Sequence, residues 1–324
     1  MTGAAMIFVA LIFLLEFGVS LDFVYGGILD SSLIPGREPA LLVVFVLGFF
    51  GFGVKAAIFP FHRWLPAASV APTPVTALLH AVAVVKSGAF AVMRLIYFLF
   101  GTSFLFGTWA QYLVMLAAAV TIVFGSVSAL RMPHLKRRLA YSTISNLSYI
   151  LLSFAIMTPA GLLGGFLHML FHAVSKITLF FCAGSILHHG HLEYSADMEG
   201  LHKKMPITCA VFLIAGLALM GVPPFGGFLS KWTIATAATE LGVWPGYVGA
   251  AALIVSAVLT ALYMLTPVIR FYFPLNQAPA LSENVHEADW QMTVPLVGLT
   301  LLLTVLSLSS GVVVEFLSKI GGGL

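Results

Sequence analysis

A row of basic side chains is the feature of this sequence that could most directly perform chemistry. His168, His172 and Lys176 recur at every fourth position of a long apolar stretch. In a helix, four residues turn the chain by about 400°, so successive members of the row drift by only about 40° and share one face. Histidine exchanges protons near neutral pH, and lysine can do so when burial disfavours its charge. The spacing therefore indicates a path for protons.

Three more lysines, Lys55, Lys86 and Lys231, lie within apolar stretches or beside prolines that interrupt them. A charged lysine at the centre of a bilayer costs about 3 kcal/mol, so these three and Lys176 would oppose insertion by roughly 12 kcal/mol. We therefore expect each of them to have a partner, water or a function. For Lys231, near the end of its predicted helix, an amine that reaches the lipid headgroups is an alternative.

Carboxylates that could neutralise these lysines are scarce. Glu16 alone is plainly inside a predicted span, whereas Glu240 and Glu315 lie close to helix ends. Polar residues of the same stretches could instead hold water between the basic groups; they are Ser145, Asn146, Tyr149, Thr143 and His80.

The row has two other interpretations. It could be a seam of hydrogen bonds between helices, or His168 and His172 could bind a metal ion. No glutamate or cysteine completes a metal site near them, so we expect no metal. The cluster of His188, His189 and His191 is expected in a loop at the solvated interface.

The elements that must position these groups follow from composition. The chain has 324 residues, of which 60% are hydrophobic and 8% charged, with a mean hydropathy of +1.05. A soluble domain is about one-quarter charged, so an ordinary soluble enzyme is excluded. Cys182 and Cys209 lie in apolar stretches without a C-x-x-C pair, which argues against disulfide, iron–sulfur or thiol redox chemistry. The scattered basic residues do not indicate nucleic-acid binding.

Apolar runs of spanning length predict an all-α polytopic membrane protein with about nine transmembrane helices. The expected spans are residues 4–28, 39–58, 74–100, 109–130, 141–157, 161–187, 207–229, 244–269 and 293–317. With the N-terminus on one side, the basic residues expected on that side are Arg63, Arg131, Lys136, Arg137, Arg138, Lys203, Lys204 and Arg270. The other side has only Arg37, Arg94 and Lys319. The positive-inside rule then predicts a cytoplasmic N-terminus and an outside C-terminus in the cell's plasma membrane.

Two of these spans are expected to be broken. The second runs through KAAIFPFHRWLP, from Lys55 to Pro66, and the seventh through GVPPFGGFLSK, from Gly221 to Lys231. Proline removes a backbone donor and clashes with the preceding turn. Backbone groups that lose their hydrogen bonds at membrane depth are tolerated only beside protein or an aqueous cavity. Two interrupted helices in one chain indicate the ion site of an inverted-repeat transporter. A simple proline kink is the alternative at either place.

A family resemblance rests on these blocks and four others. FPFHRWLPAA, APTPVTALLHA, VVKSG, LKRRLAYSTISNLSY, HMLFHAVSK and GVPPFGGFLSK occur in order. They resemble the proton-translocating antiporter-like subunits shared by respiratory complex I, membrane-bound hydrogenases and Mrp-type sodium/proton antiporters. GLHKKMPIT is more similar to the Mrp and hydrogenase-linked branch.

The resemblance implies roles for seven residues. Lys55 matches the family's lysine beside the first broken helix, and His80 and Lys86 match its linking residues. His168, His172 and Lys176 match the central relay, and Lys231 matches the terminal lysine at the second broken helix. His80 and Lys86 are about 240° apart in an ideal helix. The π-bulge common in the family would change that relation.

The resemblance also implies a departure from the family. Members usually have about fourteen spans in two inverted five-helix repeats, and this chain begins at what resembles the sixth. We expect a partial first repeat at residues 1–106, a complete second repeat at 107–271, and a loop with a final span at 272–324. The family's glutamate partner of Lys55 belongs to the earlier spans. We expect a neighbouring membrane chain to supply it, with Glu16 as a surrogate or a degenerate, non-pumping copy as alternatives.

The implied function is proton translocation, with Na⁺ as a further coupling ion, in a redox-driven complex. Because no nucleotide loop, redox motif or quinone signature is recognisable, we expect a subunit without cofactors of its own. The rivals are a subunit of an Mrp-type cation/proton exchanger and a non-conducting scaffold.

Overall fold

The structure is a computed structural model that describes residues 1–20, 22–274, 281 and 284–322. Within that part of the chain the regular secondary structure is helical, and β-pairing is limited to two isolated bridges, Gly18 with Leu29 and His134 with Tyr194. The all-α prediction is therefore confirmed for the described residues.

The N-terminal third consists of short helices. They are α1 (Thr2–Phe17), α2 (Glu38–Gly53), α3 (Trp64–Ala67), η1 (Ala68–Val70), α4 (Thr73–Ala81), α5 (Val84–Arg94), the π-helix η2 (Leu95–Phe100) and α6 (Thr102–Leu105).

The remainder contains the long helices. They are α7 (Trp109–Arg131), α8 (Leu135–Ala155), α9 (Pro159–Gly190), η3 (Ser195–Met198), η4 (Leu201–Lys203), α10 (Pro206–Met220), α11 (Gly226–Glu240), α12 (Trp244–Tyr272), α13 (Trp290–Leu308) and α14 (Ser310–Gly322).

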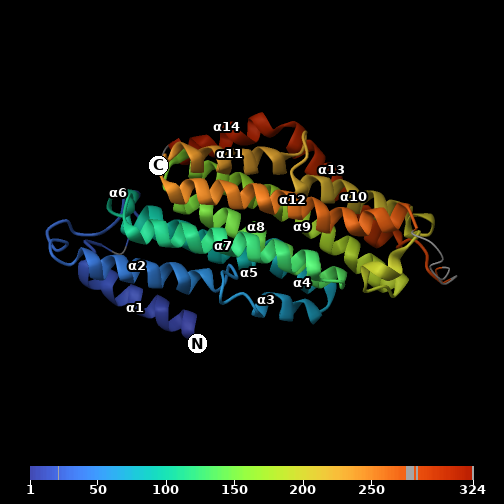
Figure 1. The fold of residues 1–324 in the computed structure, drawn as a ribbon, viewed down its shortest axis with the longest axis horizontal. Helices are drawn as coiled ribbons and strands as arrows, with labels where there is room; N and C mark the ends of the chain where they lie inside the picture. Colours follow the sequence, from blue (N-terminus) through green and yellow to red (C-terminus); the bar gives the residue numbers. More distant parts are fainter. Residues whose placement is uncertain (21, 275–280, 282–283, 323–324) are drawn as a thin grey trace.

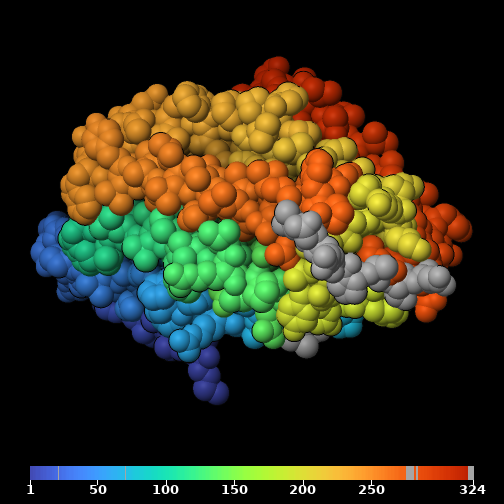
Figure 2. Space-filling view, turned by 45° about the vertical axis from the view of Figure 1, so that its right-hand side comes forward, coloured from blue at the N-terminus to red at the C-terminus, as the bar shows by residue number. Residues whose placement is uncertain are grey.

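The major helices run along the long axis of the molecule, and Figure 1 shows α1 and α2 on one side and α11 and α14 on the other. Figure 2 shows the same order as colour bands, with the first residues of α1 projecting from the body. Helix α8 lies between these sides and packs against α5, α7, α9, α11 and α12. Nearly all of its side chains are buried, including Ser142, Asn146 and Tyr149. Because protein surrounds α8, its polar residues do not face lipid.

Five helical segments among the described residues are long and apolar enough to cross a membrane. They are Thr73–Phe100, Trp109–Arg131, Pro159–Gly190, Trp244–Tyr272 and Trp290–Leu308. Helices α1, α2 and α10 are apolar but only 15 or 16 residues long. A multi-pass membrane protein is supported, and the predicted count of nine spans is not confirmed.

Several predicted boundaries are wrong in the N-terminal third. The span predicted for 4–28 ends at Phe17, because Gly18 takes an extended conformation and a glycine-rich loop follows. The span predicted for 39–58 ends at Gly53 and is followed by turns. The bounds predicted for the span 74–100 agree with the spanning segment Thr73–Phe100, which residues 82–83 divide into α4 and α5.

The later spans also differ from prediction. Helix α8 begins six residues before the predicted 141, because the charged side chains of its first turns need not face lipid. The seventh span is two helices, α10 and α11, separated by the Pro223–Pro224 segment, and α11 continues to Glu240. The ninth divides at Ser309 into α13 and α14. His188 and His189 belong to the last turn of α9, so their expected loop position is wrong, and only His191 follows the helix.

Seven of the fifteen lysines and arginines gather at one end of the molecule. Ser195 donates its backbone N–H to the Pro133 carbonyl at 3.0 Å, and Gly200 donates to the Arg270 carbonyl at 2.9 Å. These bonds join the start of α8, the α9–α10 connection and the end of α12. At the opposite end, Gly26 donates to the Tyr97 carbonyl at 3.0 Å. The basic residues at the first end are Arg131, Lys136, Arg137, Arg138, Lys203, Lys204 and Arg270.

Candidate functional site

Helix α9 positions the row of basic side chains. His168 and His172 are 2% exposed and Lys176 is fully buried. The two imidazoles lie one turn apart and nearly parallel, with ring centroids 5.8 Å apart. The prediction that the row occupies one protein-facing side of a helix is confirmed.

Lys86 of α5 meets this row directly. Its Nζ lies 2.7 Å from Nδ1 of His172, and its side chain is 6% exposed. This is within the range in which a proton passes between two titratable groups. The other nitrogen of His172, Nε2, is buried without a protein partner. Buried polar atoms of this kind are ordinarily hydrated.

His80 lies on the other side of the break between α4 and α5. Its ring stacks on Phe180 of α9 at 4.8 Å, and its Nε2 lies 3.2 Å from the Ser69 hydroxyl. In the break, the backbone N–H of Ala83 donates to the Leu78 carbonyl, five residues earlier, at 3.0 Å. This is a π-type bond. The widened turn expected between His80 and Lys86 is therefore present, and both side chains are buried.

His168 connects α9 to α8 and α11. Its Nε2 lies 3.2 Å from Oδ1 of Asn146, and its Nδ1 lies 2.9 Å from the Ser230 hydroxyl. The edge of its ring also meets Tyr149 at 5.1 Å. The contact of His168 with Ser230, which immediately precedes Lys231, was not predicted from the sequence.

Lys176 binds the backbone and a hydroxyl of α8. Its Nζ donates to the Leu139 carbonyl at 2.9 Å and to the hydroxyl of Ser142. The side-chain amide of Asn146 donates to the Ser142 carbonyl at 2.7 Å. Polar groups of α8 thus lie between Lys176 and His168.

Lys231, on α11, binds the end of α10 across the break between these two helices. Its Nζ donates to the carbonyls of Leu219 and Met220, at 2.8 and 2.9 Å, and lies 5.5 Å from the ring of Tyr149. The last carbonyls of a helix lack intrahelical partners. Lys231 therefore has partners within the chain, in the break between the two helices.

Lys55 lies apart from the buried groups. It follows the end of α2, its side chain is exposed at the surface of this chain, and its Cβ packs closely on Gly88 of α5. Among the described residues it has neither an ion pair nor a side-chain hydrogen bond. The Lys55 amine is therefore free to bind a group that lies outside the described residues.

Glu16 is not a surrogate partner for Lys55. The first turn of α1 packs on the end of α2, where Gly3 lies against Val54. Glu16 is thirteen residues further along α1, about 20 Å away. Its side chain is 62% exposed, and its carboxylate lies 3.8 Å from the guanidinium of Arg37. That alternative is wrong, because α1 ends at Phe17 and places Glu16 at a helix end.

A cluster of hydroxyls on α7, α8 and α12 was not predicted as a group. Tyr149 donates to the Ser256 hydroxyl at 2.6 Å, and Ser126 lies 2.7 Å from Ser145 and 2.5 Å from Ser256. All four side chains are buried. Isolated serines in apolar helices are the only sequence signal for such a cluster, and they do not reveal which helices meet.

Within the described part of the chain, no carboxylate neutralises the buried basic groups. The ion pairs there are Arg37–Glu16, His134–Glu193 and Lys319–Glu315. The same part holds no group of three side chains suited to a metal ion. The buried relay residues, all but Lys55, are bonded to one another and to neutral oxygen atoms.

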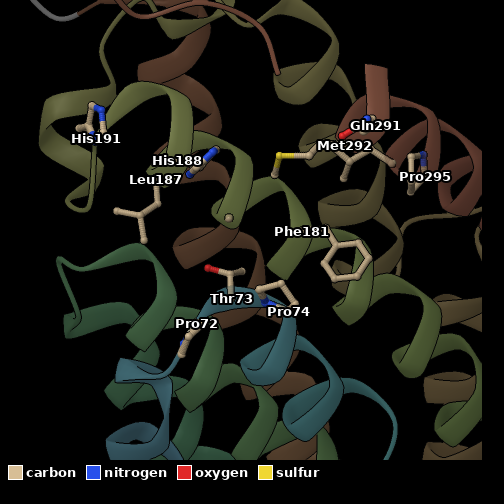
Figure 3. Close-up of a pocket in the computed structure, with 12 residues that line it drawn as sticks. Pro72, Thr73, Pro74, Phe181, Leu187, His188, His191, Gln291, Met292 and Pro295 are labelled. Carbon is tan, nitrogen blue, oxygen red and sulfur yellow. The ribbon is translucent and has the colours of Figure 1, made fainter. Parts of the chain in front are cut away.

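A separate cavity of about 620 Å³ opens at the basic end. Figure 3 shows it between Thr73 at the start of α4, His188 at the end of α9 and Met292 of α13. Its other lining groups are mostly apolar. None of the seven predicted site residues lines it.

Comparisons with known proteins place the chain in a family. The family model described as NADH:quinone oxidoreductase/Mrp antiporter, TM, matches residues 1–260. The chain is 38% identical over 249 residues to NADH-quinone oxidoreductase subunit N of Desulforudis audaxviator, covering 76% of this chain and 49% of that relative. It therefore spans about half the length of this curated relative.

Two solved complexes contain a similar fold. A chain of the Mrp complex from Dietzia sp. has a TM-score of 0.86 at 21% identity, covering 99% of this chain and 66% of that one. A chain of the membrane-bound sulfane sulfur reductase, an archaeal respiratory membrane complex, has a TM-score of 0.82 at 27% identity, covering 99% and 63%.

Proposed function

This chain belongs to the NADH:quinone oxidoreductase/Mrp antiporter transmembrane family, and from that premise we propose that it moves protons along the middle of the membrane as one subunit of a redox-driven complex. The observation that carries the proposal is the 2.7 Å contact between Lys86 and His172, which joins two helices through a pair of buried titratable groups.

The proposed path runs from Lys55 to Lys231. Lys86 and His172 exchange a proton directly, and His80 and Lys176 flank this pair. His168 takes the proton onward, and Lys231 is the last carrier. Water completes the path at His80 Nδ1 and His172 Nε2, which are buried without protein partners. Moving one charge across 100 mV costs about 2.3 kcal/mol, so modest changes in local electrostatics can drive such steps.

The partner of Lys55 is proposed to be a carboxylate of a membrane segment outside the described residues, on a neighbouring chain. Lys55 is exposed and its Cβ packs on Gly88 of α5, a helix that also exposes the apolar side chains of Val84 and Phe90, and this supports the proposal. A carboxylate that approaches or leaves Lys55 would hold or release its proton, and each tenfold change in proton affinity is worth about 1.4 kcal/mol. This would couple the relay to events in the neighbour.

We propose that the chain lies in the plasma membrane with its basic end in the cytoplasm, because the positive-inside rule favours that side for lysine and arginine. In this arrangement the loop between α1 and α2 lies outside. A cysteine in place of exposed Lys203 would then react with an impermeant maleimide only from the cytoplasmic side.

Replacement of relay residues tests the function. Lys176→Met and His172→Gln remove a titrating group while keeping most of the side-chain volume. In proteoliposomes of the assembled complex, we expect each to slow proton translocation at least about tenfold, since removing a proton carrier typically costs 10²–10⁴-fold. A pH-sensitive dye inside the vesicles measures the rate.

Lys319→Met is the matched control, because Lys319 is exposed and pairs only with Glu315 on α14. It should translocate at the normal rate. If the Lys176 and His172 variants assemble and also translocate normally, the chain is a scaffold. If translocation depends on these residues but is driven by a cation gradient without an electron donor, the chain belongs to an exchanger.

A further inference from the structure

Ser230 occupies a position next to His168 that the relay described above does not use. Its hydroxyl lies 2.9 Å from Nδ1 of His168 and 3.1 Å from the Gly227 carbonyl, to which it can donate. The side chain is fully buried. Ser230 also immediately precedes Lys231 on α11, so it contacts one proposed carrier and is the sequence neighbour of another.

The hydrogen-bond partners of His168 determine which nitrogen exchanges the proton. Asn146 donates its amide to the Ser142 carbonyl at 2.7 Å, which turns its oxygen toward Nε2 of His168. An amide oxygen only accepts, so neutral His168 carries its hydrogen on Nε2. Nδ1 then has a free lone pair, and Ser230 must donate to it.

The charged form of His168 is also fully bonded by the same atoms. A proton on Nδ1 donates to the Ser230 oxygen, and the Ser230 hydroxyl turns to the Gly227 carbonyl. Both ring nitrogens of His168 therefore have a hydrogen-bond partner in both states, and the Ser230 hydroxyl hydrogen turns from Nδ1 in the neutral state to the Gly227 carbonyl in the charged state. Nε2 stays protonated throughout, so Nδ1 is the exchanging atom.

The backbone holds Ser230 closely in this place. A Cβ on Gly226 would lie 2.1 Å from the ring of Phe171, and a Cβ on Gly227 would lie 2.0 Å from the Ala218 carbonyl. Ser307 of α13 also accepts the backbone N–H of Gly226 at 3.1 Å. The first turn of α11 is therefore pressed between α9, α10 and α13.

We propose that Ser230 is the residue through which His168 exchanges its proton with Lys231, and that Nδ1 of His168 is the atom that gains and loses it. In the forward step, charged His168 gives its Nδ1 proton to the Ser230 oxygen while the Ser230 hydroxyl proton passes through one water to the neutral Lys231 amine. His168 ends neutral, Lys231 ends charged, and Ser230 again carries one proton. This step rests on the proposed proton-translocating function.

Three substitutions test the role of the hydroxyl. In the reconstituted complex, we expect Ser230→Ala to slow proton translocation at least about tenfold and Ser230→Thr, which keeps the hydroxyl, to restore most of the rate. Ser175→Ala is the matched control, because Ser175 is buried on α9 and bonds only to the Phe171 carbonyl of its own helix. A normal rate in Ser230→Ala, with a slow rate in Lys176→Met, would overturn the proposal and leave the proposed function standing. Normal rates in both would reject the function itself.

The tautomer of His168 is a second, independent measurement. Nitrogen NMR of the full chain in nanodiscs, with ¹⁵N-labelled histidine and His168→Gln for assignment, should show neutral His168 protonated on Nε2. On acidification, the new proton should appear on Nδ1. A neutral form protonated on Nδ1 would overturn the proposal even if Ser230→Ala or Ser230→Thr fails to assemble.

Discussion

At the residue scale, the amine of Lys86 and the imidazole of His172 form the closest contact between titratable groups in the proposed path. They come from α5 and α9 and are buried together without a carboxylate among the described residues. If the contact only holds the two helices together, it requires hydrogen bonding alone, whereas a proton relay requires groups that release protons. The two roles differ in which substitutions they tolerate.

Lys86→Arg separates these roles. Arginine keeps a positive charge and several N–H donors, but its guanidinium does not release a proton under biological conditions. We therefore expect Lys86→Arg to assemble and to translocate protons at least about tenfold more slowly than the natural chain. Dye-based measurement in proteoliposomes gives the rate, and native gel electrophoresis verifies assembly. A normal rate with arginine would show that charge or hydrogen bonding alone is required.

At the element scale, the interrupted helices are completed by basic side chains. Lys231 binds the free carbonyls at the end of α10. Arg138 does the same inside α12, where its Nη1 donates to the Tyr263 carbonyl at 3.2 Å. That carbonyl would normally accept from the residue four positions later, which is Pro267 and has no N–H. The Nε of Arg138 donates to the Met132 carbonyl at 2.9 Å, so this side chain also holds α8 against the turn that precedes it.

Arg138→Met should lower the free energy of unfolding by about 1–3 kcal/mol, because two carbonyls lose their donor. Pro267→Ala provides the missing N–H for the Tyr263 carbonyl, so the loss should be about 1 kcal/mol smaller in that background. Denaturation in detergent micelles of the unchanged chain, the two single variants and the double variant measures the difference between the two losses. Arg137→Met is the control, because Arg137 is exposed beside Arg138. Equal losses in both backgrounds would contradict the proposed completion of α12.

At the scale of the whole molecule, exposed Lys55 packs on Gly88 of α5, two residues after buried Lys86. Helix α5 presents Val84, Ser87 and Phe90 to the outside there, at the spacing of one helix face. The basic end of the molecule is separate from this face. An assembly that uses the chain as proposed would therefore place a neighbouring membrane segment against α2 and α5.

Cysteine crosslinking tests that arrangement. Ser87→Cys introduces a thiol on the α5 face, and the native Cys182 and Cys209 are buried and give little background. In native membranes, a short photoactivated maleimide at this position should capture one membrane segment that carries a carboxylate. Ile254→Cys on α12 is the control, since Ile254 is 64% exposed and lies on another helix face of the molecule. Capture of lipid alone from Ser87→Cys would argue against a neighbour at Lys55.

Local sequence by itself determined the helical membrane class, the two proline breaks and the shared face of His168, His172 and Lys176. These features depend on apolar run length, on proline's missing donor and on helical periodicity, all of which act within a few turns. The number of spans and several boundaries could not be derived in this way, because α8 and the ends of α10 and α13 obtain their partners from other helices.

Only the tertiary structure decided which groups meet. Lys86 and His172 are 86 positions apart, and His168 and Ser230 are 62 apart, so no local pattern specifies their contacts. Likewise, the packing of α1 on α2 decided that Glu16 lies far from Lys55, although both residues interrupt apolar stretches. Hydrogen bonds act over about 3 Å, and that precision arises only when packed helices fix the positions of residues distant in sequence.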